Sequence, residues 1–534
     1  MKRAANSSAL RFFKQTRICH RILQGLRSQV IMTVMQSKHP NTLIHEMFNA
    51  EHFRETGHAL IDLLSRHLAD NIDAKRPVLN WQDPVTEDSH WQAPLPTSAT
   101  LDSATLLQTL EKQILANSLA IHHPRNMGHQ VATPLPIAAL CDLVASLTNQ
   151  AMTIYEVGPS ATMLERQVIR WLCNLIDDTN TKSGGVLTSG GAMANLTALL
   201  AARQIAAKEI ANKTSNNEKW NAWKTGLNGQ ARLCILASEH AHYSIARAAG
   251  IMGLGSDAVI KVATDSEGRM DVAALKAAHQ HCQQSDLHII AVVASAGCTP
   301  TGSIDPLQAI GEFCHSQGLW FHVDGAHGAS ALLSKEHRNK LTGIELADSV
   351  IWDGHKLLYM PATVSAVSFK NATHADAAFA QQASYLFQEE DDEVETKKPE
   401  DFNISYRTLE CTKRMMALKL WVAFSLYGLN GLGALVDEAF SKARLFSEKI
   451  KRHPNFELLL SPQTNIVCFR HQVPNLTASE LNTHQTKIRK HLIESGAFHL
   501  TQVELHGNVW LRTTLMNPFT TEKDLDALLS VIKK

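Results

Sequence analysis

The spacing of apolar residues changes along the chain, and its first part has a helical pattern. Between Thr42 and Leu68, and again between Ser103 and Ala116, apolar residues recur as they do on one face of a helix. The segment from Arg76 to Thr100 holds four prolines and shows little periodicity. We expect two helices joined by an extended connection.

The middle of the chain alternates short β-rich apolar runs with longer helical stretches. The runs are Gly185–Thr188, Arg232–Ala237, Ala258–Val262, His288–Val293, Leu319–Val323, Ser349–Trp352 and Val364–Phe369. Such alternation predicts crossover units that form a largely parallel sheet with helices on both faces. Ligands of such sheets bind at the carboxyl ends of the strands. The polar residues at those ends are Thr188, Ser238, Ser295, Asp324 and Asp353.

The last part of the chain predicts a smaller domain. A long helix is expected from about Cys411 to Leu426, after a charged stretch at 389–401. Two strand patterns and a final helix follow, at Asn465–Phe469, Asn508–Thr514 and Thr521–Ile532. We therefore divide the chain into a basic segment at 1–40, an N-terminal helical and wrapping segment at 41–120, a large α/β domain at 121–428 and a small C-terminal α+β domain at 429–534.

Composition and charge narrow the class of partner. Lys plus Arg and Asp plus Glu both number 51, so the overall charge gives no sign of a nucleic acid or an anionic membrane. No apolar run approaches the ~20 residues of a membrane span. Nine scattered cysteines without C-x-x-C spacing indicate free thiols in a reducing cytoplasm. We expect a soluble cytoplasmic protein whose partner is a small molecule or a second copy of itself.

The first 45 residues are basic and contain no Asp or Glu. Such a start is typical of an organelle transit peptide, of a disordered tail, or of a start codon placed too early, with Met32 and Met35 as later starts. We favour the last two interpretations, so the fold is expected to begin near His39.

A lysine and an aspartate follow neighbouring strands. The run ending at Trp352 leads into a turn with His355 and Lys356, and the run ending at Val323 leads into Asp324. An isolated lysine in a turn is usually a solvated surface residue. A carboxylate and a lysine at two strand ends, however, are what a pyridoxal phosphate enzyme needs. The lysine holds the cofactor aldehyde as a Schiff base, and the carboxylate pairs with the pyridine nitrogen.

A glycine-rich turn, Thr188 to Asn195, follows the first run and opens a helix. Its glycines allow close approach of an anion, and the helix start offers free amide groups, so it is a candidate phosphate cradle. Glycine-rich turns before helices are also common without a ligand. His240 and His242 lie at the next strand end without a third metal ligand. Stacking on a cofactor ring, or a capped helix start, suits them better than a metal site.

Five separated motifs resemble, in order, those of the group II pyridoxal phosphate-dependent decarboxylases, which include glutamate, aromatic amino acid, diaminobutyrate and sulfinoalanine decarboxylases. The motifs are Thr188–Asn195, Glu239–Ser244, Ser295–Asp305, His322–Ser330 and His355–Lys356. The resemblance extends from about Asn41 to the C terminus. Within this group, the chain looks most like the bacterial pyridoxal-dependent aspartate 1-decarboxylases. The resemblance implies a fold type I, aspartate aminotransferase-like α/β fold and pyridoxal 5′-phosphate as the cofactor.

The resemblance gives each matching position a role at the cofactor. Lys356 would bind the cofactor covalently, Asp324 would pair with the pyridine nitrogen, and His242 would stack on the ring. The remaining cofactor-binding positions are Gly191, Ala192 and His355 at the phosphate, and Ala326.

Other positions would act on the substrate. His129 and Gln130 match the family's His-Pro segment at the substrate mouth. Tyr385 lies in a stretch that resembles the mobile catalytic loop of glutamate decarboxylases, and it would be the proton donor. Arg512 matches the arginine that binds the substrate carboxylate in those enzymes, and its fork suits a carboxylate. Arg125 is a second possible partner for an acidic side chain.

Two departures from the family pattern affect the phosphate end. Many family members have Asn-Pro before His-Lys, whereas this chain has Asp353 and Gly354. A carboxylate there would repel the phosphate unless its side chain turns away or is itself paired. Ala192 and Met193 also lack the hydroxyl often found at the cradle, so backbone amides would carry most of the binding.

The implied reaction is the α-decarboxylation of an amino acid, with Tyr385 returning a proton to Cα. We expect L-aspartate as the substrate and β-alanine, a pantothenate precursor, as the product. Glutamate, giving 4-aminobutyrate, is the runner-up, and diaminobutyrate or sulfinoalanine stay open. A cofactor-binding regulatory homologue without turnover and an aminotransferase are the alternatives from other classes. The resemblance also implies a homodimer with active sites at the interface.

Overall fold

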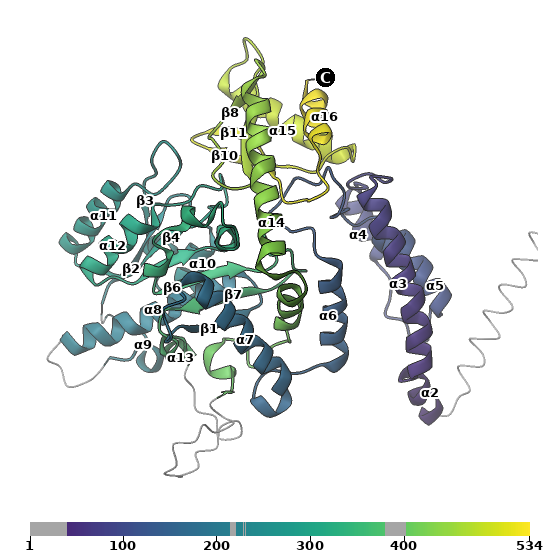
Figure 1. The fold of residues 1–534 in the computed structure, drawn as a ribbon, viewed down its shortest axis with the longest axis horizontal. Coiled ribbons are helices and arrows are strands. Elements are labelled where there is room, and N and C mark those ends of the chain that lie inside the picture. The colour runs from purple at the N-terminus through teal and green to yellow at the C-terminus, as the bar shows by residue number, and fades with distance from the viewer. Residues whose placement is uncertain (1–39, 214–219, 228, 230, 380–401, 534) are drawn as a thin grey trace, which may run out of the picture. The chain divides into compact units, whose positions relative to one another are not determined.

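The computed structural model describes residues 40–213, 220–227, 229, 231–379 and 402–533. These residues form two compact units, whose elements are labelled in Figure 1. The first unit comprises the described part of Met1–Lys75 together with Asn80–Leu119. The second comprises Arg76–Leu79 and the described part of Ala120–Lys534.

The first unit is helical. Its helices are α2 (Pro40–Met47), α3 (Ala50–Ile72), α4 (Pro84–Trp91) and α5 (Ser103–Thr109), which continues as the π-helical turn η1 (Leu110–Leu115). The helix expected from Thr42 to Leu68 is divided in two, because the Asn49 side chain accepts a hydrogen bond from the His52 amide and starts a new helix. The prediction of an extended connection between Arg76 and Thr100 was wrong at α4. This helix begins at Pro84, directly after Asp83, whose side chain caps its N-terminus.

A seven-stranded sheet forms the centre of the second unit. Its strands are β1 (Gly184–Thr188), β2 (Leu233–Ser238), β3 (Val259–Val262), β4 (His288–Ser295), β5 (Phe321–Asp324), β6 (Ser349–Asp353) and β7 (Ser365–Phe369). Their order is β1-β7-β6-β5-β4-β2-β3. Strand β7 pairs antiparallel with β1 and β6, and the other pairs are parallel. All seven expected runs form strands, and the largely parallel sheet is confirmed.

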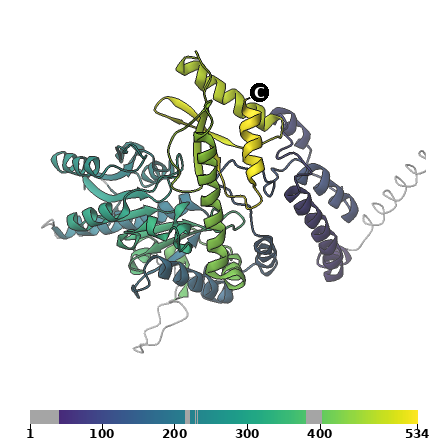
Figure 2. The ribbon, with the colours of Figure 1, turned by 45° about the horizontal axis from the view of Figure 1, so that its top comes forward.

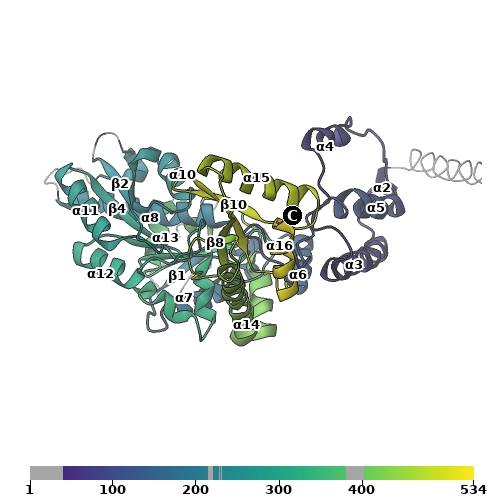
Figure 3. The ribbon, with the colours of Figure 1, turned by 90° about the horizontal axis from the view of Figure 1, so that it is seen from above.

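Helices cover both faces of this sheet, because successive strand residues alternate between two apolar cores. Leu236 and Val350 belong to a core that includes residues of α7, α11 and α12, whereas Ile235 and Ile351 belong to one that includes α8, α10 and α13 (Figure 3). The helices are α6 (Pro136–Thr148), α7 (Pro159–Ile176), α8 (Gly191–Lys213), α9 (Ala222–Thr225), α10 (Ser244–Ile251), α11 (Val272–Gln284), α12 (Leu307–Gln317) and α13 (Thr373–Phe379). Short 3-10 turns are η2 (Tyr155–Val157), η3 (Ser256–Ala258), η4 (Gly328–Leu333), η5 (Arg338–Leu341), η6 (Ile344–Leu346) and η8 (Ser405–Arg407).

The C-terminal part of the second unit has its own four-stranded antiparallel sheet, in the order β10-β11-β9-β8. Figure 2 shows this sheet with α15 and α16 beside the end of α14. The elements are α14 (Ala417–Lys451), β8 (Phe456–Leu458), β9 (Ile466–His471), α15 (Ala478–Glu494), β10 (Thr501–Leu505), β11 (Asn508–Thr514) and α16 (Glu522–Ile532).

The helix expected from about Cys411 to Leu426 begins later than predicted, at Ala417, and also ends later. Helix α14 continues to Lys451 past Gly428, whose φ of 61° and ψ of −177° interrupt the helical backbone. Among the described residues, α14 alone is long and apolar enough to cross a membrane by length and composition. Its apolar residues have partners within the fold, because Val436 belongs to a core of the large sheet and Phe446 to the core of the small one.

Candidate active site

A cavity of about 270 Å³ lies at the carboxyl ends of the central strands. The residues that line it come from the turns that follow β1, β2, β4, β5 and β6. They include all seven positions expected to hold the cofactor, which are Gly191, Ala192, His242, Asp324, Ala326, His355 and Lys356. Asn195, His327 and Asp353 line the same cavity. The fold therefore brings these separated positions to one place.

Asp324, at the end of β5, is held by hydrogen bonds from two directions. Its Oδ2 accepts from Asn195 Nδ2 at 3.0 Å, and its Oδ1 accepts from the amide of Ala326 at 3.2 Å. Because a carboxylate only accepts, Asn195 presents its nitrogen to Asp324 and its oxygen to His322 Nε2, at 2.9 Å. Burial lowers the pKa of His322 to about 4, so this ring is neutral and its Nδ1 accepts from the Ser349 hydroxyl. The direction of the Asp324 carboxylate is thus fixed from the core.

The same asparagine orients His242. Asn195 Nδ2 also donates to Ser244 Oγ at 2.9 Å, and Ser244 Oγ lies 2.8 Å from His242 Nδ1. The backbone amide of Ser244 also donates to Nδ1, at 3.3 Å, so Nδ1 is an acceptor. The Ser244 hydroxyl therefore donates to it, and the ring proton lies on Nε2. Burial lowers the pKa of His242, against the opposite effect of the Asp324 charge. The result is a neutral imidazole with one tautomer, which suits stacking on a cofactor ring.

Lys356 follows β6, and only 16% of its side chain is exposed. Its amine lies 3.0 Å from Oδ2 of Asp353. Asp353 also accepts the Ser365 hydroxyl and lies 3.6 Å from Nε2 of His355. The carboxylate that the sequence marks as a source of repulsion is therefore buried and paired.

The candidate phosphate cradle is the start of α8. The first bond of the helical pattern runs from the amide of Ala194 to the carbonyl of Gly190. The amides of Gly191 and Ala192 precede it, and such groups have no carbonyl within their own helix to bind. They are available for an anion, as the sequence predicts. A side chain at position 191 would not fit, because its Cβ would lie 2.9 Å from Oδ1 of Asp353.

Arg512, on β11, is buried beside this cavity, with 5% of its surface exposed. Its Nε donates to the carbonyl of Pro300 at 3.2 Å, next to Thr299, which lines the cavity. Its Nη1 donates to Thr501 Oγ1 at 3.2 Å, and its Nη2 is buried without a hydrogen-bond partner in the described chain. These partners are neutral oxygens. A buried guanidinium without a carboxylate carries an uncompensated charge, which an anionic ligand could balance.

Arg512 is not among the residues that line the cavity, and neither are the other predicted substrate residues. The His129 ring lies 5.7 Å from that of His499, and its pKa is lowered by burial and then by the charge of Arg512. Gln130 Nε2 is buried without a partner in the described chain. Tyr385 lies outside the described residues. Arg125, the second candidate for the substrate carboxylate, forms an ion pair with Asp524 at 3.2 Å instead.

Two residues of the site were given no role from the sequence. Asn195 is the last residue of the glycine-rich motif, and that position was its only signal. His327 follows Asp324 by three residues, lines the cavity, and has its Nε2 2.6 Å from Asn465 Oδ1. Burial and the positive charges of Lys356 and Arg512 lower the pKa of His327 to about 3. A neutral His327 therefore faces both the lysine and the arginine of the site.

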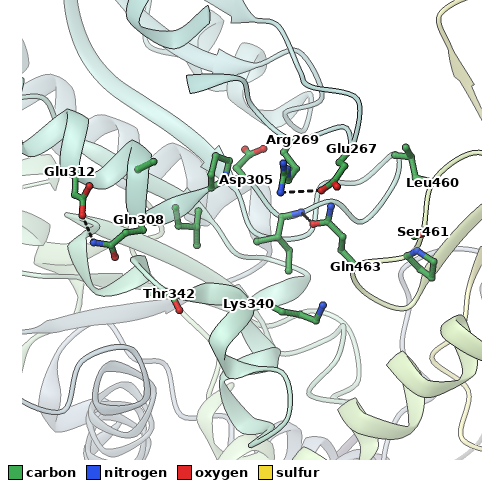
Figure 4. Close-up of a pocket in the computed structure, with 15 residues that line it drawn as sticks. Glu267, Arg269, Asp305, Gln308, Glu312, Lys340, Thr342, Leu460, Ser461 and Gln463 are labelled. Atoms are coloured by element: carbon green, nitrogen blue, oxygen red, sulfur yellow. Dashed lines mark hydrogen bonds and ion pairs between the residues drawn. The ribbon is translucent and has the colours of Figure 1, made fainter. Parts of the chain in front are cut away.

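A larger cavity of about 620 Å³ lies elsewhere, between the start of α12 and the loop at 460–463 (Figure 4). Four of its charged side chains, Glu267, Arg269, Asp305 and Glu312, have partners. Arg269 pairs with Asp265 at 2.8 Å and with Glu267 at 3.0 Å, and Asp305 accepts from two backbone amides. None of the positions expected to bind cofactor or substrate lines this cavity.

The family model described as pyridoxal-dependent decarboxylase conserved domain matches residues 90–472. This chain belongs to the pyridoxal-dependent decarboxylases. Its cofactor is pyridoxal 5′-phosphate, and it is a carboxy-lyase of fold type I. The match covers the whole large sheet, the helices α6–α14 and the strands β8 and β9 of the small sheet.

Similar proteins include decarboxylases of different substrate classes. L-2,4-diaminobutyrate decarboxylase of Rhizobium meliloti (strain 1021) is 32% identical over 441 residues, covering 82% of this chain and 83% of that one. Acidic amino acid decarboxylase GADL1 of Mus musculus is 29% identical over 475 residues, covering 86% and 82%. The crystal structure of mouse CSAD has a TM-score of 0.79 at 27% identity, over 89% of this chain and 98% of that one. The structure of Oryza sativa TDC with PLP and tryptamine has a TM-score of 0.81 at 21% identity, over 91% and 97%, which shows the fold alone.

The residues of the cavity fit this cofactor. A lysine amine, a fixed buried carboxylate, a neutral imidazole and free helix amides are the groups that its aldehyde, ring nitrogen, ring face and phosphate require. When bound, the cofactor supplies an electron sink for the loss of carbon dioxide. The protein orients the cofactor and the side chains around it. Lys356 would hold the aldehyde, and the Asn195 network keeps Asp324 and His242 in place.

Proposed function

We propose that this decarboxylase acts on acidic L-amino acids, with L-aspartate as its main substrate and β-alanine and carbon dioxide as its products. The observation that carries the proposal is the buried guanidinium of Arg512, which has a neutral carbonyl, a neutral hydroxyl and one unused nitrogen as its surroundings. A side-chain carboxylate of the substrate would supply the missing charge and a bidentate acceptor.

Two further points support this substrate class. The name of the mouse relative describes it as an acidic amino acid decarboxylase. The motif resemblance to bacterial aspartate 1-decarboxylases favours aspartate over glutamate.

Diaminobutyrate is the second candidate, because relatives at 30% and 32% identity carry that name. Its side chain is a cation, and a cation next to Arg512 would be repelled. Glutamate and cysteine sulfinate carry an acidic side chain and could also pair with Arg512. Arg512 therefore separates acidic from basic substrates.

The experiment is a product assay of the purified enzyme with pyridoxal phosphate and equal amounts of aspartate, glutamate, diaminobutyrate and cysteine sulfinate, read by mass spectrometry. We expect β-alanine as the dominant product. Dominant diaminopropane would overturn the acidic class, and dominant 4-aminobutyrate would overturn aspartate alone. The Lys356→Ala variant is the control, and it should give neither product nor cofactor attachment. A keto acid without carbon dioxide would instead indicate an aminotransferase.

We also propose that the enzyme is a cytoplasmic homodimer. The outer side of α6 supports self-association, because Leu140, Leu143, Val144 and Leu147 are 45–67% exposed on the side opposite the buried Cys141 and Ala145. Sedimentation of the wild type should give a dimer, and Leu147→Glu should weaken it. A fully active monomer would contradict this proposal.

A further inference from the structure

Asp353 is a buried carboxylate placed between the lysine and the phosphate cradle. It ends β6 and is 2% exposed. Its Oδ1 accepts the Ser365 hydroxyl, and its Oδ2 lies 3.0 Å from Lys356 Nζ and 3.6 Å from His355 Nε2. All three of its neighbours offer hydrogens or positive charge, so the site is built to keep a carboxylate in this position.

The same carboxylate packs against the start of α8. A Cβ built on Gly191 would lie 2.9 Å from Oδ1 and 3.0 Å from Oδ2 of Asp353. The carboxylate therefore lies at the positive end of a 23-residue helix, beside the amides that form the candidate cradle. An anion bound at those amides would share with Asp353 the helix end and the nearby His355.

We propose that Asp353 weakens the hold of the enzyme on the phosphate of its cofactor, so that this decarboxylase releases and rebinds pyridoxal phosphate readily. Two like charges that share one buried helix end repel each other, and the low effective dielectric of the cavity preserves that repulsion. The pairing of Asp353 with Lys356 and Ser365 makes the carboxylate tolerable but leaves it in place. Asp353 is thus a positioning residue that sets the affinity for the cofactor, and it does not select the substrate.

The variant that tests this proposal is Asp353→Asn, which keeps the size of the side chain and a hydrogen bond to Ser365 but removes the charge. Equilibrium dissociation constants are measured with three probes. Pyridoxal phosphate has both the aldehyde and the phosphate, pyridoxal lacks the phosphate, and 4-deoxypyridoxine 5-phosphate lacks the aldehyde. The readout is binding, followed by absorbance or by dialysis, so it does not depend on which amino acid is the substrate.

We expect Asp353→Asn to bind both phosphate-bearing probes about tenfold more tightly or better, and pyridoxal as the wild type does. Two outcomes would overturn the proposal. If the dissociation constants of pyridoxal phosphate and pyridoxal change together while that of 4-deoxypyridoxine 5-phosphate stays the same, Asp353 acts only through Lys356. If the phosphate-bearing probes bind no better or bind more weakly, its charge does not oppose the phosphate.

A matched control lies at the other end of the same strand. Asp348 precedes β6 and accepts the amide of Phe321 at 2.8 Å, and it does not line the cavity. Asp348→Asn removes one carboxylate charge from the same strand and should leave all three dissociation constants unchanged. Thermal unfolding of both variants without cofactor establishes that each is folded. An equal tightening in Asp348→Asn would show a general charge effect and contradict a local role for Asp353.

Discussion

Asn195 connects the two cofactor-facing side chains to the protein core, and its removal gives the most informative perturbation of the site. Its side chain makes hydrogen bonds to Asp324, Ser244 and His322 at 2.9–3.0 Å. Replacement by alanine leaves Oδ2 of Asp324 and Nε2 of His322, both buried, without their partner. We predict that Asn195→Ala folds but holds pyridoxal phosphate poorly, because Asp324 and His242 lose their fixed directions.

The magnitude follows from the types of bond that are lost. A hydrogen bond to a charged group contributes about 1.5–3 kcal/mol, and each neutral one about 0.5–1.5 kcal/mol. The unfolding free energy should therefore fall by about 2.5–6 kcal/mol. If only the bond to Asp324 affects cofactor affinity, the dissociation constant should rise about 10- to 100-fold. Urea unfolding and a cofactor titration measure the two quantities separately.

Asn517→Ala is the matched control. Asn517 is 2% exposed, and its amide nitrogen donates to the carbonyl of His123 at 2.7 Å, away from the cavity. The Asn517→Ala variant should be less stable than the wild type but should bind pyridoxal phosphate with the same affinity. Wild-type cofactor affinity in Asn195→Ala, or an equal loss of affinity in Asn517→Ala, would show that Asn195 does not orient Asp324 and His242 for the cofactor.

Two further predictions concern stability. Between pH 6.5 and about 4 the unfolded chain protonates His322 and the folded chain does not, so the unfolding free energy should fall as the pH falls, by about 3 kcal/mol from this group. His322→Gln should show a shallower pH slope in urea unfolding, and an unchanged slope would contradict this origin. Lys413 forms a buried ion pair with Glu165, and both bind the backbone of Leu187. Lys413→Met should cost about 3–5 kcal/mol, and adding Glu165→Gln should recover part of it; additive losses would show that the two charges do not compensate each other.

The sheet could be predicted from the sequence because its strands are buried on both faces. Apolar runs such as Leu319–Val323, when they alternate with helical stretches, indicate buried strands of a parallel sheet. The eight cysteines in the described part of the chain are free thiols, as their scattered positions indicate. Helix α14 was predicted too short, because the small domain was expected to begin at residue 429. The helix continues because packing on both sheets stabilises it beyond the kink.

The site was predictable where chemistry requires a particular residue type, and less so where geometry decides. Lys356 and Asp324 follow from their strand-end positions and the chemistry of the cofactor. The role of Asn195 depends on which side chains lie within 3 Å of it, and those come from positions 244, 322 and 324. The sequence likewise marked Asp353 as repulsive but could not show that Lys356 and Ser365 pair with it.

The central claim, that Arg512 selects an acidic substrate, is tested most directly by the ratio of kcat/KM for aspartate to that for diaminobutyrate in Arg512→Met. Arg470→Met is the control, since Arg470 is also 5% exposed on the same small sheet but contacts Asn508 and Trp510. We predict that Arg512→Met lowers kcat/KM for aspartate by about 100-fold or more, with a much smaller change for diaminobutyrate, whereas Arg470→Met keeps the wild-type ratio. An unchanged ratio in Arg512→Met would contradict the account.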